Sequence, residues 1–258
     1  MRVVTINFWG TEEPLDLRLN LAIRQLRAID PDVICMQEVK AHGGATTAHT
    51  IANAIGMHAL YGHGTDEGGG QGVALITRKP LATHELVKLP FTNPADEQRV
   101  LLSGEIDGVW VHTTHLNYRL DDGVAREHQV LAIDDAIRAR RTLTSPPQIL
   151  CGDFNATPDS DEIRFLRGLH TLGGRRTHFQ DAWMRLHPHD DGITWSSENE
   201  QTRPLRSLDI DRRIDFIFVT SRKKDGRGTI ESCSLGLTDR EQGNCASDHY
   251  AVIADITT

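Results

Sequence analysis

Apolar positions along the chain form short β-type runs that are separated by longer segments with helical spacing. Between residues 15 and 29 they recur three and four positions apart, which predicts a helix, and Asp30-Pro31-Asp32 ends it because the residue before a proline avoids helical backbone. Further helices are predicted at residues 46–55, 122–140 and 160–169. Strands are predicted at residues 3–6, 33–36, 73–77, 99–106, 109–114, 148–151, 214–219, 229–235 and 250–256.

The order of these elements predicts a layered domain with mixed sheets. Asp107-Gly108 joins two of the predicted strands, and this dipeptide suits the positive backbone angles of a two-residue hairpin turn. Helices combined with parallel and antiparallel strands predict an α/β or α+β architecture. Because neither an internal repeat nor a low-complexity linker divides the sequence, we expect residues 1–258 to form one domain.

Composition places the chain among ordinary globular proteins and makes it acidic. Its 258 residues include 28 Lys and Arg against 36 Asp and Glu, a formal net charge of −8, and 38% of them are hydrophobic. These values exclude a disordered chain, a collagen and a disulfide-rich scaffold. Proteins that bind the nucleic-acid backbone usually present a basic surface, so the charge disfavours a nucleic acid as the partner.

The apolar segments are too short for a membrane protein. The N-terminal residues MRVVTINFWG lack the apolar core of a signal peptide, and later apolar runs fall short of membrane-spanning length, so we expect a cytoplasmic protein without membrane insertion. The four cysteines form no CxxC or Cys/His zinc pattern, and we expect reduced thiols. Whether Cys233 and Cys245 pair is left open by the sequence, as is the oligomeric state.

Polar residues gather where predicted strands end, which is where scaffolded sites usually form. Alone, an Asp-x-Asn or Ser-Asp-His run is an ordinary turn or helix cap. Together, carboxylates at one sheet edge repel one another unless a cation or substrate lies among them. Oxygen-rich side chains without thiolates suit Mg²⁺ or Mn²⁺ better than zinc. The residues are Asn7, Gln37, Glu38, His115, Asn117, Asp153, Asn155, Asp215 and Ser247-Asp248-His249.

In order along the chain, these segments resemble the motifs of the endonuclease/exonuclease/phosphatase superfamily. The resemblance spans residues 5 to 249, and its strength lies in the order of the strings rather than in any one of them. The strings are Thr5-Ile6-Asn7, Gln37-Glu38, Gly72-Val73-Ala74, Thr114-His115-Leu116, Gly152-Asp153-Phe154-Asn155, Arg213-Ile214-Asp215-Phe216-Ile217 and Ser247-Asp248-His249.

The resemblance implies a fold and a chemistry. The fold would be a four-layered α/β-sandwich, with two mixed sheets packed face to face and flanked by helices. The chemistry would be metal-dependent hydrolysis of phosphate esters with Mg²⁺ or Mn²⁺ as the cofactor. Glu38 would be the principal metal ligand, helped by Asn7 and Asp248, while Asp153 and Asn155 would hold the attacking water and the scissile phosphate. Whether one or two metals bind is left open.

The resemblance also assigns the proton-handling groups. His249, oriented by Asp215, would be the general base or would stabilise charge on the phosphate, and His115 would protonate or stabilise the leaving oxygen. The acidic partner of His115 is left open, with Glu67 as a candidate. A His-Leu pair at this position resembles the sphingomyelinase, deadenylase, inositol-phosphatase and deoxyribonuclease branches rather than the abasic-site endonucleases.

Basic residues near these motifs are candidates for substrate contact. Arg206 and Arg212 precede the Asp215 motif, in a loop expected at the site entrance, where they would grip a second acidic group. Arg99 and Asn117 are further candidates, whereas Arg222-Lys223-Lys224 is interpreted as solvated loop charge. The favoured function is therefore hydrolysis of a small phosphomonoester or phosphodiester. The alternatives are a nuclease or deadenylase-like enzyme and, less favoured, an inactive binding protein.

Overall fold

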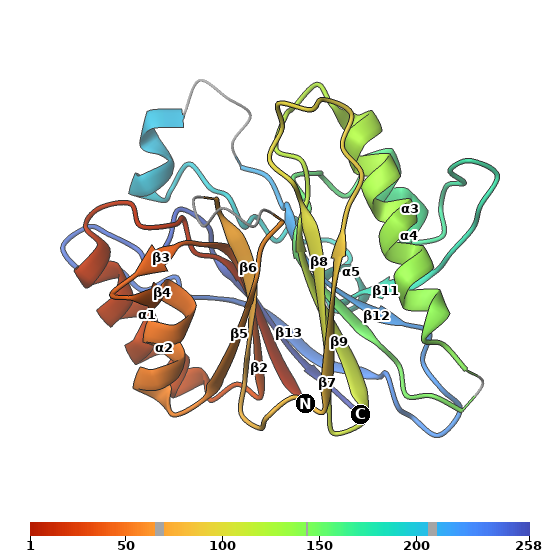
Figure 1. Cartoon of the computed structure of the whole chain (residues 1–258), viewed down its shortest axis with the longest axis horizontal. Coiled ribbons are helices and arrows are strands. Elements are labelled where there is room, and N and C mark those ends of the chain that lie inside the picture. The colour runs from red at the N-terminus through yellow and green to blue at the C-terminus, as the bar shows by residue number, and fades with distance from the viewer. Residues whose placement is uncertain (65–69, 143, 206–210) are drawn as a thin grey trace.

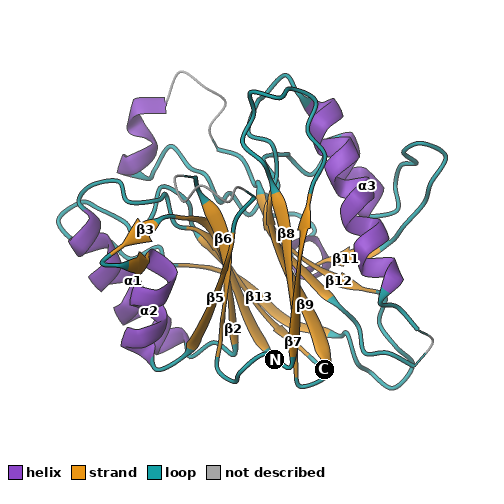
Figure 2. Cartoon of the chain, in the orientation of Figure 1, coloured by secondary structure: helices purple, strands orange, loops and turns teal. Residues whose placement is uncertain are grey.

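Two mixed β-sheets lie face to face in the computed structural model, which describes residues 1–64, 70–142, 144–205 and 211–258 (Figure 1). Each sheet has six strands, and helices cover the two outer faces (Figure 2). The predicted four-layered α/β-sandwich is therefore confirmed.

The first sheet contains the N-terminal strand and has one parallel pair at its centre. Its strand order is β13 (Ile230–Gly236), β14 (Ala251–Ile256), β1 (Arg2–Asn7), β2 (Val33–Val39), β6 (Gly72–Thr77) and β5 (His58–Gly62). Strands β1 and β2 are parallel and the other neighbours are antiparallel. Helices α1 (Leu15–Ile29) and α2 (Thr47–Ile55) pack on its outer face, and β3 (Ala41–His42) with β4 (Ala45–Thr46) forms a small separate hairpin.

The second sheet repeats this arrangement with its own parallel pair. Its strand order is β11 (Phe179–Asp181), β12 (Asp215–Thr220), β10 (Ile149–Asp153), β9 (Val109–His115), β8 (Val100–Ile106) and β7 (Thr83–Lys88). Strands β9 and β10 are parallel, and the other pairs are antiparallel. Helices α3 (Gly123–Ala139) and α4 (Asp161–Leu166) cover it, followed by the short α5 (Ala182–Leu186) and a 3₁₀ helix at Glu200–Leu205.

Neighbouring residues of each central strand belong to different cores, because successive side chains of a strand point to opposite faces. In β1, Val3 packs between the sheets while Val4 packs against the outer helices. In β10, Cys151 faces the inter-sheet core and Leu150 faces the helices. Burial on both faces explains why these strands are continuous apolar runs in the sequence.

The structure corrects the predicted elements mainly at the edges of the sheets. Strands β5 and β7 and the small elements β11 and α5 were not predicted, and β7 is almost entirely exposed, so it carries no apolar pattern. The helix predicted at residues 160–169 ends at Leu166, and Gly168 then takes a positive φ of 76°. The four cysteines are buried free thiols, as expected. Among the described residues, none of the helices is both long and apolar enough to cross a membrane.

Candidate active site

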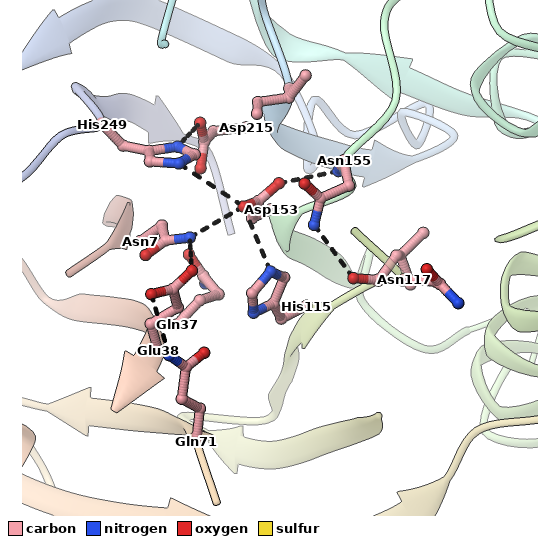
Figure 3. A network of polar contacts seen from close by, with 12 residues as sticks. Asn7, Gln37, Glu38, Gln71, His115, Asn117, Asp153, Asn155, Asp215 and His249 are labelled. Carbon is pink, nitrogen blue, oxygen red and sulfur yellow. Dashed lines mark hydrogen bonds and ion pairs between the residues drawn. The ribbon is translucent and has the colours of Figure 1, made fainter. Parts of the chain in front are cut away.

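The functional candidates meet at one edge of the two sheets, where several strands begin or end (Figure 3). Parallel strands β9 and β10 end side by side, which aligns His115 with Asp153, and antiparallel β12 begins with Asp215 opposite Asp153. From the first sheet, Asn7 ends β1 and Glu38 lies near the end of β2. The alternation of strand directions therefore brings residues far apart in sequence into one cluster.

Asn7 connects the two sheets at this cluster. Its Nδ2 donates to Glu38 Oε1 at 3.0 Å and to Asp153 Oδ2 at 2.9 Å. Glu38 reaches this position because its φ is 51°, at an irregularity in the pairing of β2 with β6. Gln71, which was not predicted, donates to Glu38 Oε2 at 3.3 Å. The carboxylate of Glu38 is therefore oriented from two sides.

The residue before Asp153 has to be a glycine. A Cβ atom at Gly152 would lie 2.1 Å from Thr114 O on the neighbouring strand, far inside contact distance. Only glycine lets β10 approach β9 so closely next to the site. The Gly-Asp-x-Asn string thus serves packing as well as chemistry.

His249 and Asp215 form a buried hydrogen-bonded pair. His249 Nδ1 lies 2.8 Å from Asp215 Oδ2, and His249 Nε2 lies 3.9 Å from Asp153 Oδ2. Burial by itself lowers the pKa of His249, but the carboxylates of Asp215 and Asp248 outweigh it, and the pKa lies well above its ordinary value. The imidazole is consequently a charged donor that faces the cavity.

His115 is held in the neutral state, in contrast to His249. Its Nδ1 lies 3.1 Å from Arg99 Nη1, and its Nε2 lies 3.5 Å from Asp153 Oδ2. Arginine only donates hydrogen bonds, so Nδ1 accepts and Nε2 carries the proton. Burial, Arg99 and His249 together hold the pKa of His115 well below its ordinary value. A neutral His115 can therefore donate one hydrogen bond from Nε2 into the cluster. Its Nδ1 partner is an arginine, and Glu67 lies outside the described residues.

The carboxylates of the cluster lie close enough to oppose one another's ionisation. Burial and then Asp215 raise the pKa of Asp153 to about 7, and burial and then Asp248 raise the pKa of Glu38. Among the residues that the structure describes, Asp215 Oδ1 is buried without a hydrogen-bond partner. A divalent cation would relieve this repulsion and satisfy the unpaired oxygen, so the oxygen-rich donor set fits Mg²⁺ or Mn²⁺.

The residues closest to a ready-made metal site differ from the predicted ligands. Oxygen or nitrogen atoms of Asp153, Asp215 and His249 all lie within 4.8 Å of one another. The predicted ligands Glu38 and Asp248 line the same cavity, and Asn7 contacts Glu38. A protonated His249 has no lone pair for a cation, so the carboxylates of this one acidic cluster are the candidate ligands.

A cavity of about 500 Å³ opens above these groups. Trp195 lines it although its side chain is largely buried, whereas Trp183 packs in the inter-sheet core. Around the mouth, Tyr118 and Leu120 are more than half exposed. The site thus combines charged groups at its base with an apolar rim.

The predicted substrate contacts occupy different places. Arg212 lines the cavity, and Arg206 lies outside the described residues. Arg99 is buried against His115 and Glu97 and lines a neighbouring cavity. The side chain of Asn117 is buried and donates to Asp96 and Asp122, so it holds its own loop instead of lining the cavity.

Arg18 supports the site and was not predicted from the sequence. Its side chain is fully buried and donates to three backbone oxygens, those of Phe8, Glu12 and Ala246. Burial lowers the pKa of Arg18 to about 10. These bonds tie the segment after Asn7 to the segment before Asp248. The sequence does contain a signal for this role, because Arg18 is a charged residue at an apolar position of α1.

The chain is similar to known proteins in both sequence and structure. A family model described as the endonuclease/exonuclease/phosphatase family matches residues 4–249. The protein angel of Drosophila melanogaster is 28% identical over 278 residues, which cover 91% of this chain and 70% of that protein.

Solved structures share the fold over the whole chain. Truncated TDP2 of Caenorhabditis elegans matches with a TM-score of 0.77 at 18% identity and covers 100% of this chain and 97% of its own. TDP2 of D. rerio, complexed with a single-strand DNA product, matches with a TM-score of 0.78 at 19% identity, covering 100% and 99%. The human Nocturnin catalytic domain with a bound sulfate anion matches with a TM-score of 0.73 at 18% identity, covering 100% and 93%.

Proposed function

Because this chain belongs to the endonuclease/exonuclease/phosphatase family, we propose that it is a divalent-metal-dependent hydrolase of a small phosphate ester. The observation that carries this proposal is the placement of Asp153 between two histidines of opposite character. His249 is a charged donor on one side, and His115 is a neutral donor on the other. Such a pair suits a phosphoryl group whose entering and leaving oxygens lie on opposite sides of phosphorus.

The metal would bind in the acidic cluster at Glu38, with Asn7 and Asp248, which leaves His249 as a charged donor. When bound, Mg²⁺ or Mn²⁺ would offset negative charge on the phosphate oxygens. Asp153 and Asn155 would hold the attacking water, and His249 would stabilise the charge that develops on the phosphate. His115 would donate its Nε2 proton in a hydrogen bond to the leaving oxygen.

The shape of the site favours a diester over a monoester. The cavity of about 500 Å³ continues into a neighbouring one of about 470 Å³, and the two share Glu38, His115 and Tyr118. The neighbouring cavity is also lined by Lys40 and Arg99. A phosphate bound at the junction would have room for one organic group on each side, which is the geometry of a phosphodiester.

A nuclease or deadenylase-like activity is the second candidate. The same two-sided cavity would accept an oligonucleotide, and the similar TDP2 structure of D. rerio is complexed with a single-strand DNA product. Against it stands the net charge of −8, which repels a long polyanion at a distance. Arg212 at the cavity still attracts a compact second phosphate at close range.

A substrate screen tests the proposal. Bis-nitrophenyl phosphate, nitrophenyl phosphate, sugar and inositol phosphates, nucleotides and short oligonucleotides are incubated with Mg²⁺, with Mn²⁺ and with EDTA. We expect metal-dependent turnover that is faster with the bis-ester than with the monoester, and loss of turnover in Asp153→Asn. Efficient cleavage of oligonucleotides without turnover of any small ester would favour the nuclease. No turnover of any substrate would favour an inactive binding protein.

A further inference from the structure

A second concave site lies at the other end of the second sheet, in the region of β11, β12 and α5 (Figure 1). This distal pocket has a volume of about 430 Å³, within the range of pockets that hold small molecules. Strand β12 begins at Asp215 in the candidate active site and ends at Thr220, next to Ser221 and Arg222 of the distal pocket. At 3.3 Å per residue, about 20 Å of strand separates the two sites.

Four separate segments bring basic side chains to the distal pocket. Arg167 follows α4, His178 precedes β11, Arg185 lies in α5 and Arg222 follows β12. The chain has a net charge of −8, but three arginines line this one concavity, so the local charge there is positive. Like charges gathered around one pocket repel, so an anion between them would be favoured.

The acidic residue that lines the distal pocket does not neutralise it. Asp181 is bonded to Arg213 through both carboxylate oxygens at 3.0 Å, and both side chains are almost fully buried. Asp181 Oδ1 also accepts from the backbone N–H of Met184 at the start of α5. Its charge is therefore matched by Arg213, outside the set of arginines that line the pocket.

The guanidinium groups of the pocket have N–H donors that make no hydrogen bond within the described residues. Arg222 donates its Nε to Thr229 Oγ1 at 2.8 Å, and Arg167 donates one terminal nitrogen to Pro158 O at 3.3 Å. Within the described part of the chain, the side chain of Arg185 has neither a hydrogen-bond nor an ion-pair partner. Planar guanidinium groups match pairs of phosphate oxygens, and the remaining donors point to this class of ligand.

We propose that the distal pocket binds a small ligand that carries one or more phosphate groups. Its basic side chains gather around one concavity rather than along a stripe, so it suits a compact anion better than the extended backbone of a nucleic acid. It shares no lining residue with the candidate active site. The proposal is therefore independent of the hydrolase activity.

Calorimetric titration of the full chain tests this proposal, with inorganic phosphate and pyrophosphate as probes and EDTA present to exclude metal-dependent binding at the active site. We expect binding of pyrophosphate to weaken at least tenfold in Arg185→Ala/Arg222→Ala. Arg24→Ala/Arg27→Ala on α1 removes the same charge elsewhere and should change the affinity less than twofold. Glu38→Gln, which alters the active site, should also leave it unchanged.

Folding and ligand size are controlled in the same experiment. Arg185→Ala alone breaks no bond within the described part of the chain and should still weaken binding, while turnover of bis-nitrophenyl phosphate stays at the wild-type rate. The proposal is overturned if wild type binds neither probe, if the control pair loses as much affinity, or if the loss occurs in Glu38→Gln instead. A single-stranded oligonucleotide without terminal phosphates serves as the polymer probe. If it binds more tightly than pyrophosphate and this binding is lost in Arg185→Ala/Arg222→Ala, the site binds a polymer and the proposal is also overturned.

Discussion

His249 Nδ1 lies 2.8 Å from Asp215 Oδ2, and this bond joins the segment before β14 to the start of β12. Because Asp215 both orients the imidazole and raises its pKa, the two side chains act as one unit. In the proposed mechanism, removing either partner would remove the same contribution to the transition state.

Asp215→Asn and His249→Ala should therefore have non-additive effects. We expect each single variant to lower kcat about 10²–10⁴-fold, the usual range for a proton-handling residue, and the double variant to lose little more. Steady-state kinetics on bis-nitrophenyl phosphate, measured for wild type, both single variants and the double variant, gives the double-mutant cycle. Losses that multiply in the double variant would mean that the pair does not work together.

Glu38→Gln should abolish turnover by weakening the metal site. The amide keeps the shape of the side chain but lacks the charge that holds a hard cation, so Mg²⁺ or Mn²⁺ affinity should fall at least tenfold in a calorimetric titration. Without metal, the thermal midpoint should hold or rise, because repulsion from Asp248 is relieved. Glu105→Gln makes the same chemical change beside the β8–β9 hairpin turn, at the opposite end of the sheet from the site, and serves as the control. Wild-type metal affinity in Glu38→Gln would refute the ligand assignment.

The sequence predicted the central strands because burial on both faces leaves a continuous apolar run. Strand β2 is one example, since Val33 and Cys35 face one core while Ile34 and Met36 face the other. Edge strand β7 was missed because its largely exposed residues leave no such pattern. The family resemblance, read from motifs at strand ends, is confirmed by the match over residues 4–249.

The electrostatic details of the site were beyond the sequence because they depend on register and burial. Arg99 was predicted as a substrate contact, and only the pairing of β8 with β9 brings it against His115. The roles of the motif residues came from the resemblance. The charge states of His115 and His249 follow instead from their neighbours in three dimensions.

Arg18→Met should destabilise the protein and disturb the site together. Methionine fills similar space but leaves the oxygens of Phe8, Glu12 and Ala246 without their donor, at a cost of roughly 2–4 kcal/mol. The metal affinity should fall as well, because these segments carry Asn7 and Asp248. Urea unfolding and metal titration measure the two effects.

Arg24→Met is the matched control for Arg18→Met, since Arg24 lies on the exposed side of the same helix and pairs with Glu241 at the surface. Such an exposed pair contributes about 0–1 kcal/mol. Equal destabilisation by the two variants would show that the buried bonds of Arg18 are not what holds these segments.

His112 should make the stability depend on pH between about 4 and 6.5. The imidazole is fully buried between Ser103 and Gln148, and burial lowers its pKa from 6.5 to about 4. In that interval the unfolded chain binds a proton that the folded chain does not, so stability falls as the pH falls. The loss amounts to roughly 3 kcal/mol when pH 4 is reached. Because carboxylates titrate in the same range, the measurement is the difference in urea-unfolding free energy between wild type and His112→Gln across this interval. The variant should lose less stability on acidification, and parallel pH profiles would show that His112 is not the group responsible.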